Sequence, residues 1–162
     1  MIWGPEYWTP DANVLRVTRL TDYATVVLTV LAARPGDVLS AADLAAAAGL
    51  ELPTVAKLLR PLAQSGLVEG FRGAGGGYRL ARDAADISLV EIVEAMEGPL
   101  GMTECSLHDG ACGIQDSCGV RANWRRINDV VADALRAVTL AEMLAPPPRR
   151  ARKAIPARLA TA

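Results

Sequence analysis

The sequence predicts a mainly α-helical fold, a winged helix-turn-helix with a small β-hairpin wing and a long C-terminal helix. Three observations predict it: two helical patterns separated by a glycine turn, a glycine-dense loop between strand-like runs, and a helical pattern that continues over residues 120–144. The chain has 162 residues, of which 51% are apolar, and this is enough to build the core of one domain.

The helix-turn-helix is expected in the first half of the chain. Its helices are expected over residues 19–33, 41–48 and 53–65. Ser40 can cap the second helix, and Gly49 suits the left-handed position that ends it. Pro53 fits the first turn of the third helix, whereas Pro61 predicts a kink or an earlier end.

The glycine-dense segment predicts a wing. Residues 67–72 and 78–80 are short strand-like runs on either side of Gly73–Gly77. A loop that cradles phosphate would need a helix after the glycines, and here a strand follows. The segment therefore indicates a hairpin attached to the helix-turn-helix, and a further helix is expected over residues 88–96.

The rest of the chain is expected to hold a loop and one long helix. Residues 101–119 contain all three cysteines, and residues 120–144 carry apolar side chains three and four apart, the spacing of a helix–helix seam. The seam residues are Trp124, Ile127, Val131, Ala134, Val138 and Ala141. The expected divisions are a disordered extension or upstream-start artefact (1–13), the winged helix-turn-helix (14–98), the cysteine loop (99–119), a dimerisation helix (120–145) and a disordered basic tail (146–162).

Charge is unevenly distributed, although the net charge is only −1. Residues 53–82 hold five positive side chains and one acid, residues 83–118 hold eight acids and no Lys or Arg, and residues 119–162 hold nine positive side chains and three acids. No apolar run reaches the roughly 18 residues of a membrane span, and the first residues do not resemble a signal peptide. We therefore expect a cytoplasmic protein without a membrane partner.

The positive side chains of the third helix and the wing predict double-stranded DNA as a partner. Thr54, Lys57 and Arg60 share one face of the helix that would enter the major groove. Arg72 and Arg79 flank the wing tip, where they can reach phosphates or a narrow minor groove. A winged helix that contacts other proteins is the alternative.

The three cysteines indicate a metal centre. Cys105, Cys112 and Cys118 lie within 14 residues, without the CxxC pair of a zinc ribbon or a thiol oxidoreductase. Iron–sulfur clusters are held mainly by cysteine thiolates, so the sequence predicts such a cluster. An enzyme with a reactive cysteine is not expected, because the chain lacks a CxxC pair and His108 is its only possible histidine partner. Zinc held by the three cysteines and His108, or three unrelated cysteines, are the alternatives.

Several segments occur in the order found in one family. They are Arg19–Ala24, Arg72–Leu80, Ile87–Leu89 and the three-cysteine loop. Over about residues 14–144 the chain resembles the Rrf2 (IscR/NsrR-type) family of iron–sulfur winged-helix regulators. Cys118–Asn128 and Val138–Glu142 resemble most the branch that controls the SUF iron–sulfur assembly operon. The resemblance implies a homodimer with crossing C-terminal helices on a palindromic operator, a [2Fe–2S] or [4Fe–4S] cluster, and DNA affinity that depends on the cluster.

One position departs from the IscR branch. That branch has a histidine three residues after the third cysteine, where this chain has Arg121, a poor ligand because it stays protonated. The resemblance to the NsrR branch implies that Asp22 of the partner subunit completes the site, and His108 is the other candidate. Asp22 can also be an ordinary acid at a helix start. The expected function is a cluster-controlled repressor of SUF genes; a nitric-oxide or redox sensor of other genes and a zinc-stabilised interaction module are the alternatives.

Overall fold

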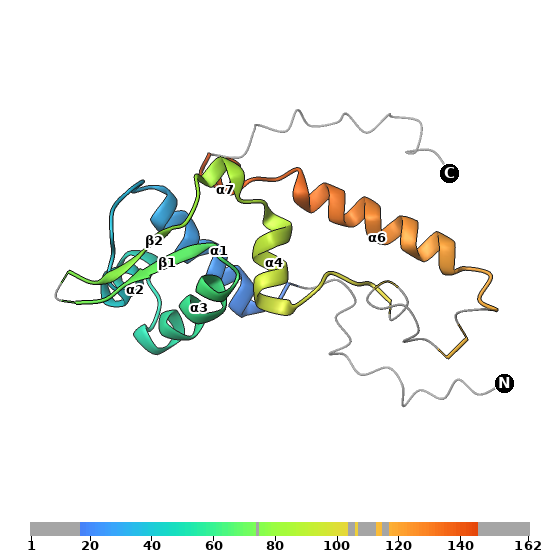
Figure 1. The fold of residues 1–162 in the computed structure, drawn as a ribbon, viewed down its shortest axis with the longest axis horizontal. Coiled ribbons are helices and arrows are strands. Elements are labelled where there is room, and N and C mark those ends of the chain that lie inside the picture. Colours follow the sequence, from blue (N-terminus) through green and yellow to red (C-terminus); the bar gives the residue numbers. More distant parts are fainter. Residues whose placement is uncertain (1–16, 74, 104–105, 107–112, 115–116, 146–162) are drawn as a thin grey trace, which may run out of the picture.

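The computed structural model describes residues 17–73, 75–103, 106, 113–114 and 117–145. The N-terminal elements are α1 (Arg19–Ala32), α2 (Ala41–Ala48), α3 (Leu52–Gln64), β1 (Val68–Phe71) and β2 (Gly77–Leu80). A 3₁₀ turn, η2 (Ala84–Asp86), and the helices α4 (Leu89–Glu97), α6 (Arg121–Arg136) and α7 (Leu140–Leu144) follow. The expected mainly helical, winged arrangement is thus present (Figure 1).

Local signals set most of the helix boundaries. Ser40 and Asp43 form a capping box at the start of α2, with Asp43 N donating to Ser40 Oγ over 3.1 Å. Gly49 ends α2 in the left-handed conformation at φ 65°. α3 continues through Pro61 to Gln64, so the early end that Pro61 suggested does not occur. Proline lacks an N–H and crowds the carbonyl one turn earlier, yet the following turn still closes, with Ser65 N donating to Pro61 O over 3.0 Å.

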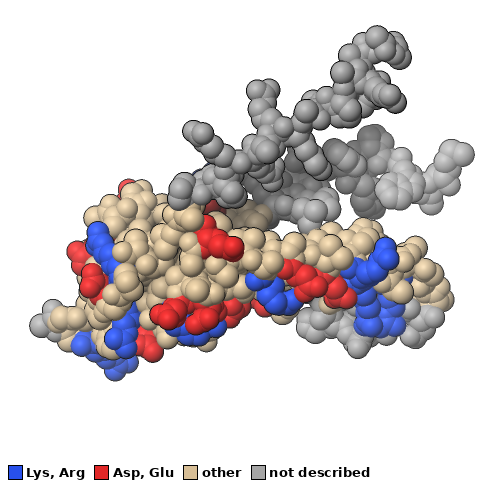
Figure 2. Space-filling model, turned by 90° about the horizontal axis from the view of Figure 1, so that it is seen from above, with Lys and Arg blue, Asp and Glu red and all other residues tan. Residues whose placement is uncertain are grey.

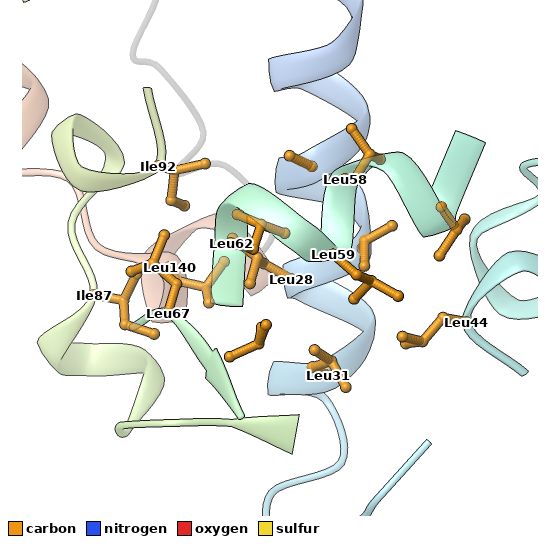
Figure 3. Close-up of a cluster of buried hydrophobic side chains, with 14 of the residues drawn as sticks. Leu28, Leu31, Leu44, Leu58, Leu59, Leu62, Leu67, Ile87, Ile92 and Leu140 are labelled. Atoms are coloured by element: carbon orange, nitrogen blue, oxygen red, sulfur yellow. The ribbon is translucent and has the colours of Figure 1, made fainter. Parts of the chain in front are cut away.

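One core joins elements from both ends of the described chain (Figure 3). Its largest fully buried side chains are Leu28, Leu31, Leu44, Leu58, Leu59, Leu62, Leu67, Ile87, Ile92 and Leu140. Leu140 comes from α7, which packs against α1, so residues more than 100 positions apart share this core. Burying a leucine of this kind contributes about 1.5–3 kcal/mol.

The single helix expected over residues 120–144 is wrong. α6 ends at Arg136, and Thr139 begins α7 by capping it, with Glu142 N donating to Thr139 Oγ1 over 3.2 Å. Leu140 N also donates to Ile87 O over 2.8 Å, so the break pairs with the chain just before α4. The helix stops because burying Leu140 in the core requires the chain to turn back.

α6 extends away from the core and packs against α4 (Figure 1). None of its residues is buried, and Trp124, Ile127 and Val130 are 39%, 40% and 64% exposed. Among the residues that the structure describes, no helix is long and apolar enough to cross a membrane. α6 therefore leaves apolar side chains uncovered within the described part of the chain.

Candidate nucleic-acid interface and metal-binding cysteines

The core face of α3 fixes which side chains the helix presents outward. Val55, Leu58, Leu59 and Leu62 are 0–1% exposed and turn this face inward. Lys57 and Arg60, both expected at the interface, are exposed on the opposite side. Thr54 is half-buried, so it lies at the edge of that surface rather than on it. Gln64, four residues after Arg60 on the same helix, is also exposed.

The wing is a two-stranded antiparallel hairpin that is tied to the start of α2. Tyr78 N donates to Leu39 O over 2.8 Å, and Leu39 N donates to Tyr78 O over 2.9 Å. A Cβ on Gly77 would lie 2.4 Å from Leu39 O, so only glycine permits this close approach. The wing is therefore held in a fixed place beside the helix-turn-helix.

The positive side chains of this surface differ in how they are paired. Within the described part of the chain, Lys57, Arg60 and Arg72 make no ion pair. Arg79 pairs with Glu69 over 3.0 Å, and Arg82 pairs with Glu91 over 2.6 Å. Figure 2 shows blue and red side by side at the end of the molecule that holds the wing. The surface is therefore mixed in charge, and three cations on it remain available to an anionic partner.

Asp22, the expected fourth ligand, is exposed in the first turn of α1. Close to it in the chain, Thr18 N and Thr21 Oγ1 both donate to Glu97 Oε1, the former over 3.0 Å. Partial burial would raise the pKa of Glu97, but these hydrogen bonds outweigh burial and hold that pKa below its ordinary range. The end of α4 is thereby fixed to the start of α1, a contact that no local sequence pattern indicated.

Of the expected cluster ligands, the structure describes Cys118 and Asp22. Cys118 is a free, half-buried thiol just before α6, and its carbonyl accepts from Arg121 N over 3.3 Å. Cys105, Cys112 and His108 lie outside the described residues. Among the residues described, no three His, Cys, Asp or Glu side chains converge to hold a metal ion. The cysteine site accordingly stays a prediction.

Comparison with known proteins decides the family. The model of the Rrf2 family, described as an iron-dependent transcriptional regulator, matches residues 17–146. The chain belongs to the Rrf2 family. It is 33% identical over 131 residues to protein aau3 of Rhizobium meliloti (strain 1021), with 80% of this chain and 85% of that protein covered. It is 32% identical over 131 residues to the HTH-type transcriptional regulator IscR of Escherichia coli, with 80% of each covered.

A solved structure also supports the winged-helix fold. The global cysteine regulator CymR of B. subtilis matches with a TM-score of 0.63 and 27% identity, over 80% of this chain and 96% of that one. The expected Rrf2 resemblance and the winged-helix fold are both confirmed. As an Rrf2 protein, the chain is a DNA-binding transcriptional regulator and not an enzyme.

Proposed function

We propose that this Rrf2 regulator is a cytoplasmic, homodimeric repressor whose affinity for a palindromic operator depends on an iron–sulfur cluster. Its target genes in this proposal are those of SUF-type cluster assembly. The observation that carries the proposal is that Lys57 and Arg60, on the exposed face of α3, make no ion pair among the described residues. Relatives of the protein regulate transcription.

The DNA surface consists of α3 and the wing. Lys57 and Arg60 suit base edges in the major groove, where Arg and Lys recognise guanine, and Thr54 lies at the edge of the same face. Arg72, next to the wing tip, suits a phosphate, and Arg79 lies on the same hairpin. Because the hairpin is hydrogen-bonded to Leu39, α3 and the wing approach DNA as one unit.

The dimer is supported by α6. Val120, Trp124 and Ile127 recur four and three residues apart, and all are exposed at 39–53%. This spacing forms a seam when it faces a second helix. A second copy of α6 would cover the row and bring two copies of α3 to the two halves of a palindromic site.

The cluster is supported by the chemistry of its donors. Cys118 is free and half-buried, and Cys105 and Cys112 precede it by 13 and six positions. Three thiolates are soft ligands that suit iron–sulfur clusters, and the carboxylate of the partner subunit's Asp22 would be a harder, weaker fourth ligand. Bound there, the cluster would supply a redox-sensitive centre that small molecules can reach. His108 is the alternative fourth ligand.

DNA recognition is tested by selecting duplexes from a random pool with the full-length protein. Lys57→Ala and Arg60→Ala should each weaken binding to the selected duplex by about 1–3 kcal/mol and relax the preference at one base position. Arg136→Ala removes the same charge from α6, outside the proposed DNA-binding surface, and should leave the selected sequence unchanged. A selected sequence that is the same for all three variants would contradict this use of α3.

The cluster is tested by anaerobic purification, with iron and sulfide counted per chain. The wild-type protein should be coloured, and Cys105→Ala, Cys112→Ala and Cys118→Ala should each be nearly colourless. Asp22→Ala should keep iron but change the visible circular dichroism, whereas Asp37→Ala, another exposed acid, should not. If the wild-type protein is colourless and contains zinc, the cysteines hold zinc and the cluster proposal is wrong. If the spectrum changes in His108→Ala and not in Asp22→Ala, His108 is the fourth ligand.

A further inference from the structure

One cation of the wing, Arg79, already contacts an acidic and an aromatic side chain. Arg79 Nε and Nη2 donate to the same oxygen, Glu69 Oε2, over 3.1 and 3.0 Å. The Arg79 guanidinium carbon also lies 4.7 Å from the centre of the Phe71 ring. A carboxylate and an aromatic ring thus hold one guanidinium in one place.

The strand register explains this arrangement. Glu69 and Arg79 are directly opposed across β1 and β2, and Phe71 follows Glu69 by two residues on the same face of the hairpin. This face is open to solvent, since the Arg79 and Glu69 side chains are 43% and 46% exposed. Phe71 is 39% exposed beside them. The pair is therefore accessible to DNA, although its two charges cancel.

Arg72 and Arg79 consequently present different charges to a phosphate. Arg72 has no ion pair among the described residues, so it offers a full positive charge. Arg79 has to leave Glu69 before it can act as a full cation, and the Glu69 carboxylate repels a phosphate that approaches the pair. An exposed ion pair such as this is weak, but it competes directly with the single phosphate contact that Arg79 could make.

We propose that Glu69 limits the affinity of the wing for DNA of any sequence by withholding Arg79 from the phosphate backbone. The inference rests on the proposed DNA binding by α3 and the wing. Contacts to phosphate supply most of the affinity for random DNA, and each contact also adds to the salt dependence of binding. When Arg79 is kept from the phosphates, discrimination between the operator and random DNA depends on the base contacts of Lys57 and Arg60 rather than on the wing.

The test measures binding of the full-length protein to a random-sequence duplex between 50 and 200 mM salt. Glu69→Gln keeps the size of the side chain and removes its charge, so Arg79 should gain a phosphate. The slope of log affinity against log salt should steepen by about 0.9, and affinity should fall about 3.5-fold more over this fourfold salt range than it does for the wild type. Arg79→Gln alone should leave the slope unchanged, and Glu69→Gln combined with Arg79→Gln should restore the wild-type slope.

The control breaks a similar pair elsewhere. Asp133→Asn frees Arg136 from its 2.5 Å ion pair on α6 and changes the net charge by the same amount, so its slope should match the wild type. An unchanged slope in Glu69→Gln, or a flatter slope in Arg79→Gln alone, would overturn the inference, because Arg79 would then be unable to reach a phosphate or would already contact one. A wild-type protein without salt-dependent binding would instead refute DNA binding by this surface.

Discussion

Replacing Gly77 with alanine should displace the wing from the helix-turn-helix. The new Cβ would lie 2.4 Å from Leu39 O and 2.6 Å from Leu39 C, and both are backbone atoms that no side-chain rotation can move. The strand has to shift, and the two hydrogen bonds between Leu39 and Tyr78, at 2.8 and 2.9 Å, are the first to be lost. At about 0.5–1.5 kcal/mol for each bond, the free energy of unfolding should fall by about 1–3 kcal/mol.

Gly75→Ala is the matched control from the same loop. No atom lies within 4 Å of a Cβ built on Gly75, and its φ is not positive, so alanine should change stability by no more than about 0.5 kcal/mol. Urea unfolding followed by far-ultraviolet circular dichroism measures both variants. Gly77→Ala should also weaken binding to random DNA, since Arg72 moves with the wing. Equal stability of the two variants would refute the idea that close backbone packing requires glycine at position 77.

The remaining predictions concern the core and the contact between α4 and α1. Leu140→Ala should reduce the free energy of unfolding by about 2–5 kcal/mol because the side chain is fully buried, whereas Leu144→Ala, at 40% exposure, should cost far less in the same urea titration. The pKa of Glu97 is held below its ordinary range, so its contribution to stability is present at neutral pH and is lost as the pH falls through the acid range. Glu97→Gln should therefore flatten the dependence of thermal stability on pH below about pH 5, and an unaltered pH profile would show that the bonds from Thr18 and Thr21 do not stabilise its charge.

Sequence predicts the helix-turn-helix and the wing well because their signals are local. Ser40 and Gly49 mark the two ends of α2 through the conformation of their own backbone, and α2 begins and ends where they indicate. The glycine run predicts a hairpin for the same reason. Gly77 is also needed for a reason that the local sequence does not show. The backbone of Leu39, far from Gly77 in the sequence, leaves no space for a Cβ at this position.

Contacts between distant segments account for what sequence could not predict. The apolar spacing continues past Arg136, yet the helix breaks because Leu140 enters a core that includes α1. The charge count placed Arg79 with the free cations, because a count along the chain does not show that Glu69 lies opposite it across a hairpin. The cysteine spacing predicts a metal centre, but the convergence of its ligands depends on residues outside the described chain.

The segment that carries the cysteines is anchored to the DNA-reading domain at both ends. On its N-terminal side, Glu97 accepts hydrogen bonds from Thr18 and Thr21 at the start of α1. On its C-terminal side, α6 leads to the break where Leu89 N donates to Val138 O over 2.8 Å. A ligand held by the cysteines would therefore act on α1 and on the start of α4, and both helices pack directly against α3. The proposed cluster would therefore be coupled to the recognition helix through α1 and α4, the two helices that pack against α3.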